Sequence, residues 1–168
     1  MTNLTELRIS SHQQVSDISL LASLTNLTLL HLSVEKISDV SPLVVLDNLT
    51  ELHLPSNQIS DISALGSMTN LTYLTLTANQ ISDVSPLSSL TNLTSLVLSG
   101  NQISDVSPLG SLNNLTGLFI ASNQISDISP LIVLSNLRSL QLTGNPLSAE
   151  SVHIHIPQLE ERGVHVAQ

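Results

Sequence analysis

The chain has 168 residues, no cysteine and a formal charge of −9, from 4 basic and 13 acidic side chains. Without cysteine it can form neither a disulfide nor a cysteine-based zinc or redox site. So few cations provide no basic surface that would attract nucleic acid or anionic lipid. No apolar run approaches the roughly 18 residues of a membrane span.

The N-terminus, MTNLTELRIS, enters the first repeat directly at Leu4. It lacks a basic segment followed by an apolar core, so no signal peptide is visible and the cellular location stays open. In this first unit SSHQQV replaces the asparagine segment of later units and is one residue longer. The segment could serve as a makeshift cap. We favour a chain cut from a longer parent, surface-exposed or secreted if so, with an uncapped end open to self-association.

Seven units follow one another, 23 residues apart once and 22 thereafter. They begin at Leu4, Leu27, Leu49, Leu71, Leu93, Leu115 and Leu137. The shared pattern is L-x-x-L-x-L-x-x-N-Q-I-S-D-[IV]-S-P-L-x-x-L-T-N, which matches the leucine-rich repeat, whose period is about 20–29 residues. One unit cannot bury its leucines alone, so stacked neighbours must form a shared core.

Each unit contains a short strand, as in LTSLVLSGN at 93–101. Leu93, Leu96 and Leu98 should point inward, while the two neighbours of Leu96 point outward by the alternation of a strand. Successive strands should pair in parallel, about 4.8 Å apart. The predicted fold is therefore a repeat solenoid with one parallel sheet.

An asparagine column follows the strands, comprising Asn57, Asn79, Asn101, Asn123 and Asn145. The backbone loses its strand partners at this turn. A buried asparagine side chain can satisfy the freed groups with both its donors and its acceptor.

The SPL tripeptides then predict a short 3-10 turn, with serine at the N-cap and proline at the first helical position. In SPLGSL, Leu109 and Leu112 should close the core of their unit from the side opposite the strand.

The C-terminal segment GNPLSAESVHIHIPQLEERGVHV breaks the pattern and predicts a terminal cap over the last rung. Ser148 can cap a helix, Pro157 can restart it, and Gly163 can end it in the left-handed conformation. The residues VHV then alternate like a final strand. We expect one continuous domain, made of a repeat array at 1–147 and a cap at 148–168.

The stretch NQISDVSPLSSLTNLTSLVL resembles the 22-residue repeat of bacterial internalins and related bacterial leucine-rich repeat proteins. The resemblance extends over nearly the whole chain and includes the Asn, Ser-Asp, Pro-Leu and Thr-Asn columns. It implies a leucine-rich repeat arc with a parallel concave sheet and convex 3-10 turns. It also implies recognition of proteins on the concave face.

Six aspartates recur in the Ser-Asp column: Asp17, Asp39, Asp61, Asp83, Asp105 and Asp127. Stacked carboxylates could suggest a calcium ladder, but a single file does not make several oxygens converge on one ion. Local hydrogen bonds from these side chains to the backbone are the expected role.

Outward strand positions hold the candidate binding residues. The chain's single Tyr and single Phe, Tyr73 and Phe119, both fall there with Val97 on the unit between, which predicts one compact hot spot. Gly117 should leave a depression beside Phe119. The expected partner-binding residues are Glu6, Arg8, Leu29, His31, Glu51, His53, Tyr73, Thr75, Val97, Phe119 and Gln141.

His31 and His53 share a column on adjacent units, with Glu51 on the same face. Two histidines and a carboxylate could bind zinc. A solvated, pH-sensitive half of an interaction surface is the preferred interpretation. No metal, cofactor or catalytic residue is assigned, because neither a G-x-S-x-G elbow nor a glycine-rich phosphate loop occurs.

The sequence thus predicts a non-enzymatic module that binds a protein through its concave sheet face. The alternative is a structural spacer or display scaffold from a larger bacterial multidomain protein. Nucleic acid binding and membrane insertion are not expected.

Overall fold

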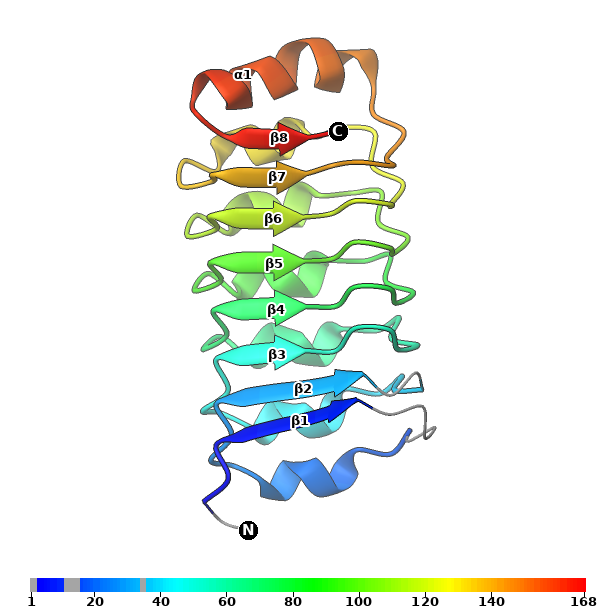
Figure 1. The fold of residues 1–168 in the computed structure, drawn as a ribbon, viewed down its shortest axis with the longest axis vertical. Coiled ribbons are helices and arrows are strands. Elements are labelled where there is room, and N and C mark those ends of the chain that lie inside the picture. Colours follow the sequence, from blue (N-terminus) through cyan, green and yellow to red (C-terminus); the bar gives the residue numbers. More distant parts are fainter. Residues whose placement is uncertain (1–2, 11–15, 34–35) are drawn as a thin grey trace.

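The computed structural model describes residues 3–10, 16–33 and 36–168. Each unit consists of a strand, a turn and a short helix, and the units stack along one axis (Figure 1). Eight strands form one open parallel sheet in sequence order: β1 (Glu6–Ser10), β2 (Leu29–Ser33), β3 (Glu51–His53), β4 (Tyr73–Thr75), β5 (Ser95–Val97), β6 (Gly117–Phe119), β7 (Ser139–Gln141) and β8 (His165–Ala167).

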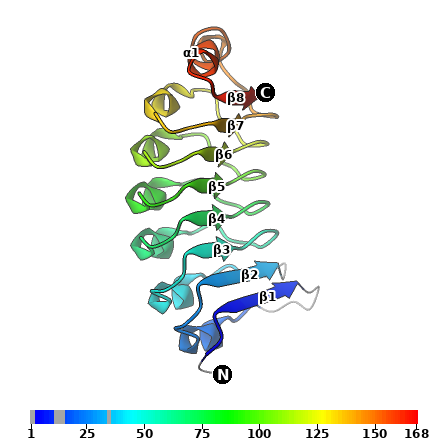
Figure 2. The same cartoon turned by 60° about the vertical axis from the view of Figure 1, so that its left-hand side comes forward.

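A second layer of short 3-10 helices lies behind the sheet (Figure 2). These helices are η1 (Ser19–Ser23), η2 (Ser41–Val45), η3 (Ser63–Ser67), η4 (Ser85–Ser89), η5 (Ser107–Ser111) and η6 (Ser129–Val133). The predicted solenoid, with a parallel sheet on one side and 3-10 turns on the other, is therefore confirmed.

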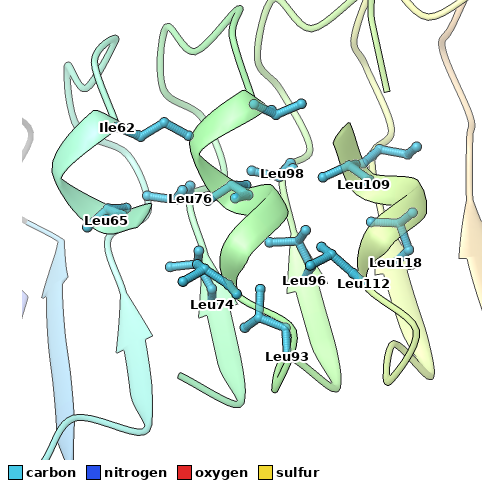
Figure 3. Packing of buried hydrophobic residues seen from close by; sticks show 14 of the residues in the cluster. Ile62, Leu65, Leu74, Leu76, Leu93, Leu96, Leu98, Leu109, Leu112 and Leu118 are labelled. Atoms are coloured by element: carbon cyan, nitrogen blue, oxygen red, sulfur yellow. The ribbon is translucent and has the colours of Figure 1, made fainter. Parts of the chain in front are cut away.

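The core lies between these two layers. The core contains leucines of the strands, such as Leu74, Leu96 and Leu118, and leucines in or next to the 3-10 helices, such as Leu109 and Leu112 (Figure 3). All five are fully buried. Each fully buried leucine contributes about 1.5–3 kcal/mol relative to an exposed one, and one contiguous cluster spans the units.

The asparagine column connects adjacent units through hydrogen bonds. In Asn101, the amide nitrogen donates to the carbonyls of Leu76 and Leu98 at 3.0 and 2.8 Å, while the side-chain oxygen accepts from the Ile81 N–H at 3.0 Å. Asn57, Asn79 and Asn123 are likewise buried, whereas Asn145, in the last unit, is only half-buried. The predicted use of both donor and acceptor is confirmed.

The residue before each of these asparagines has a positive φ. Gly100 has φ +72° and Ala78 has φ +55°. A residue with a Cβ pays a steric cost in this left-handed conformation, and glycine does not. The asparagine that follows, as in Asn101, donates to a carbonyl just before the turn and to a carbonyl of the preceding unit, and so holds the turn in place.

The prediction that serine caps the 3-10 turns is wrong. Ser107 is the first residue inside η5, and the preceding residue, Val106, has no side chain able to cap. The cap is Asp105, whose Oδ1 accepts the Ser107 N–H at 2.8 Å. The backbone path places Ser107 inside the turn, so its own N–H is one of the free donors, and the aspartate two residues earlier accepts it.

The C-terminal cap follows the predicted order with small shifts. The Ser148 hydroxyl accepts the Ser151 N–H at 3.1 Å, and the helical segment continues through a π-helical turn, η7 (Ser151–His155), into α1 (Ile156–Glu161). Gly163 has φ +84°, as predicted for the helix end. The final strand begins one residue later than the VHV alternation suggested, at His165.

The two ends of the solenoid differ in how well they cover the core. At the C-terminal end, Ile156, Leu159 and Val164 are at most 4% exposed and cover the last rung. At the N-terminal end, Leu4, Leu7, Leu21 and Leu24 are only partly buried, and Leu20 is 87% exposed. The segment considered as a makeshift cap lies mostly at 11–15, outside the described residues.

Candidate functional site

The outward side chains of the strands form two columns on one face, which we call the sheet face. It is the surface expected to be concave. Strand register places Glu6, Leu29, Glu51, Tyr73, Ser95, Gly117 and Ser139 in the first column, and Arg8, His31, His53, Thr75, Val97, Phe119 and Gln141 in the second. All the residues expected to bind a partner therefore lie on one face.

Three rings form a continuous stack across β2, β3 and β4. The rings of His31 and His53 stack with centroids 5.5 Å apart and planes at 29°. The Tyr73 ring lies 4.8 Å from that of His53, tilted by 31°. The adjacency of the histidines was predicted. The inclusion of Tyr73 was missed, although diagonal neighbours on adjacent strands are known to be within reach of aromatic side chains.

Charged groups flank this stack. The Glu51 carboxylate lies 3.7 Å from Nε2 of His53, and Glu6 lies 3.7 Å from Arg8. The side chain of His53 is 17% exposed, and its Nε2 makes no hydrogen bond within the described structure. Burial, and then the neighbouring His31, lower the pKa of His53, while Glu51 partly offsets them.

The lowered pKa of His53 predicts a pH dependence of stability. Because the native pKa lies below the ordinary value of about 6.5, the unfolded chain takes up the proton first. Stability should therefore fall as the pH drops through about 6.5, and the loss should stop growing below the native pKa. Urea unfolding of His53→Gln between about pH 7.5 and 5 should show a shallower decline than wild type. His153→Gln, at an exposed position of the cap, is the matched control and should keep the wild-type decline. Equal slopes for all three proteins would contradict the assignment.

Phe119 and Gly117 form a second group, and here one expectation is wrong. The Cε2 atom of Phe119 lies 3.0 Å from the point that a Cβ at Gly117 would occupy. The ring therefore covers the glycine, which is buried, and no depression remains for a partner. The small residue instead lets the aromatic ring lie flat along its own strand, with Val97 beside it in register on β5.

Tyr73 and Phe119 consequently make their side-chain contacts in two different groups on the sheet face. Tyr73 leans on the histidine stack, whereas Phe119 lies over Gly117 two strands further along. The side chains of Tyr73, Val97 and Phe119 are all half-buried. The sheet face thus has a polar aromatic zone on β2, β3 and β4 and an apolar zone on β5 and β6.

Leu29 offers less surface than expected. It is 8% exposed, although it lies outside the leucine core and on the sheet face. Its register partners are Glu6 and Glu51, whose long side chains flank it on both sides. Leu29 therefore presents little apolar area on the sheet face.

The aspartate column has the structural role that was expected. Each Oδ1 accepts the backbone N–H two residues later at 2.8 Å. Hydrogen bonds from the backbone and side chain of the serine two residues later hold the pKa of these carboxylates below the ordinary range. In Asp61 the bond from the Ser63 backbone is the largest cause of the lowered pKa. Within 3–10, 16–33 and 36–168, no group of three His, Asp or Glu side chains is arranged to hold a metal. Those same ranges contain no helix of the length and apolarity that crossing a membrane requires.

Comparison with known proteins places this geometry in a family. A family model described as Leucine Rich repeats (2 copies) matches residues 2–44, 47–89, 74–111, 91–133 and 113–155. Among curated proteins, none matches the chain.

Solved structures share the architecture. Internalin C2 from Listeria monocytogenes is 46% identical with a TM-score of 0.80, over 84% of this chain and 62% of that one. A second Listeria monocytogenes internalin, inlF, is 34% identical with a TM-score of 0.72, over 99% of this chain and 54% of that one. The chain thus spans less than two thirds of the length of these internalins.

A more distant neighbour is the leucine-rich repeat ectodomain of the plant receptor kinase GASSHO1/SCHENGEN3 from Arabidopsis thaliana, solved in complex with CASPARIAN STRIP INTEGRITY FACTOR 2. It is 30% identical with a TM-score of 0.75, over 87% of this chain and 19% of that one. The same family is indicated by the 22-residue period, by the asparagine and aspartate columns, by the family model and by these structures. The chain belongs to the leucine-rich repeat family, and its repeats are of the internalin-like kind.

Proposed function

We propose that this protein binds a partner protein through its sheet face. Leucine-rich repeat proteins in general mediate protein–protein interactions, and the plant ectodomain solved in complex with a factor is one example. The observation that carries the proposal for this face is the placement of the only tyrosine and the only phenylalanine of the chain. Both lie on outward strand positions, where the repeat pattern does not require an aromatic residue.

The physical properties of the face favour binding. Strands held on both sides by backbone hydrogen bonds and backed by a leucine core present side chains that are already ordered, so little entropy is lost on association. Aromatic side chains are typical anchors of interface hot spots. We assign the polar aromatic zone of His31, His53 and Tyr73, and the apolar zone of Val97 and Phe119, to two contact regions of one partner.

Binding requires no catalytic residue, metal or cofactor, and we assign none. The second candidate role is a spacer or display scaffold within a longer protein. The partial coverage of the internalins is compatible with it. A spacer would tolerate changes on the sheet face without loss of any interaction.

Substitution of the two aromatics tests the proposal. Immobilised wild-type protein should retain a partner from the lysate or the secreted fraction of the source organism. The affinity for that partner is then measured by calorimetry. Tyr73→Ser and Phe119→Ser should each weaken binding by at least about 1–2 kcal/mol, or roughly 5- to 30-fold in Kd. The melting temperature should change little, because both side chains lie outside the leucine core.

Asp105→Asn, on the opposite side of the unit, is the control and should bind as wild type. Asparagine can still accept the Ser107 N–H, so the turn should persist. If both aromatic variants bound with wild-type affinity while Asp105→Asn bound more weakly, the binding surface would lie outside the sheet face. Unfolding of the aromatic variants would show that these rings serve stability.

A further inference from the structure

Glu51 differs from the other charged residues of the sheet face in its ion-pair partner. Histidines aside, the outward positions of β1 to β7 contain three ionised side chains, Glu6, Arg8 and Glu51. Glu6 and Arg8 pair with each other at 3.7 Å. Among the described residues, the only ion-pair partner of Glu51 is His53.

His53 does not compensate this carboxylate at neutral pH. Burial is the largest cause that holds the pKa of His53 below its ordinary value of about 6.5, so the imidazole is mostly uncharged at about pH 7.5. Its Nε2 lies 3.7 Å from Oε2 of Glu51, which is too long for a hydrogen bond. Within the described structure, the negative charge of Glu51 is therefore left without a positive neighbour.

An aromatic ring lies next to this carboxylate. Tyr73 is the register partner of Glu51 in the first column of the sheet face, one strand away at about 4.8 Å. The ring leans on His53 and is half-buried, so part of it faces solvent. A carboxylate beside an exposed ring fits lysine and arginine, whose stems pack on apolar surface while their charged ends reach an anion.

Binding through the sheet face makes a cation at this position favourable. The side chain of Glu51 is 47% exposed, and a partner lying across β3 and β4 would bury it further. Burying a carboxylate is costly unless the partner supplies a positive charge. We propose that the partner carries a lysine or arginine whose charged end pairs with Glu51 and whose stem packs on Tyr73. This inference rests on the proposed function and adds the chemistry of the partner.

The charge of the whole chain favours the same class of partner. The formal charge is −9, and the six aspartates of the Ser-Asp column are all exposed. A negative potential of this kind speeds the encounter with a basic segment and repels an acidic one, and salt screens both effects. The complementary surface on the partner is therefore basic.

A small charged probe tests the site directly. The probe is N-acetylarginine amide, and N-acetylcitrulline amide is its uncharged analogue of nearly the same size. In a magnetic resonance titration of the isotope-labelled full chain at about pH 7.5, the arginine probe should shift the backbone amides of β3 and β4. Its Kd should be at least about threefold lower than that of the citrulline probe at low salt.

Glu51→Gln should raise the Kd of the arginine probe to that of the citrulline probe, because it removes the charge and keeps the size of the side chain. Glu160→Gln removes the same charge at an exposed position of α1 and should leave the Kd unchanged. Equal Kd values for the two probes in the wild-type protein would overturn the inference. Shifts confined to the aspartate column behind the sheet would overturn it as well.

The partner retained by the immobilised protein distinguishes this inference from the proposed function. Glu51→Gln should raise the Kd for that partner by at least about threefold, and Glu160→Gln should not. If Tyr73→Ser weakened binding while Glu51→Gln kept wild-type affinity, the sheet face would bind without a cation at Glu51, and this inference alone would be wrong. If the arginine probe bound at Glu51 while Tyr73→Ser and Phe119→Ser kept wild-type affinity for the partner, the cation site would stand and the proposed function would be wrong.

Discussion

Asn101→Ala should lower the free energy of unfolding by about 1–3 kcal/mol, because it leaves the buried N–H of Ile81 without a partner. The variant also loses the two bonds to the carbonyls of Leu76 and Leu98, which still accept from the amides of Asn79 and Asn123. Asn101 itself is 8% exposed, so water cannot readily replace its amide. Urea unfolding followed by circular dichroism measures the loss.

Asn92→Ala is the matched control in the same repeat. Asn92 is exposed, and its amide donates one hydrogen bond, to the Thr69 carbonyl at 2.9 Å. Its loss should cost about 1 kcal/mol or less, because water can solvate the carbonyl. If both variants unfolded at the wild-type urea concentration, the asparagine column would not be what holds neighbouring units together.

Leu159→Ala should destabilise the C-terminal end by about 2–5 kcal/mol, the range for emptying a buried leucine site. Leu159 lies on α1, is fully buried and belongs to the continuous core. Because each unit of a solenoid contacts only its neighbours, the loss should be concentrated at this end. Hydrogen exchange should accelerate at β7 and β8 before it changes at β4.

The control in the same cap is Ile154→Ala. Ile154 is 49% exposed, so about half of its side chain is already in water and the expected cost is about 1 kcal/mol or less. Uniformly faster exchange from β1 to β8 in Leu159→Ala would show that the solenoid unfolds as one unit. Wild-type exchange at β7 and β8 would show that the cap does not protect the last rung.

The repeat determines what could be predicted from the sequence. Leu96 is core and Ser95 is surface because the period and the strand alternation together fix the inward direction. The same alignment assigns Asn101 its three partners, since every one of them is a repeat position. These features are shared by all units, and the sequence shows the shared pattern several times, so they can be predicted from it.

The errors concern contacts that differ from unit to unit. Tyr73 stacks on His53 and Phe119 covers Gly117 because of the particular side chain one strand or two residues away, which no periodic pattern contains. Leu29 is buried for the same reason, since its neighbours are glutamates. The capping error has another origin: Ser107 and Asp105 are both good capping residues, and only the backbone path decides which one reaches the N–H.

Hydroxyl-radical footprinting of the protein bound to its partner tests the central claim most directly, because it reads the exposure of individual side chains. Binding through the sheet face predicts that Tyr73, Phe119 and His31 lose reactivity in the complex. Val45 and Val133, which are 47% and 59% exposed on η2 and η6 behind the sheet, should keep theirs. Protection of Val45 and Val133, with unchanged oxidation of Tyr73 and Phe119, would contradict the account.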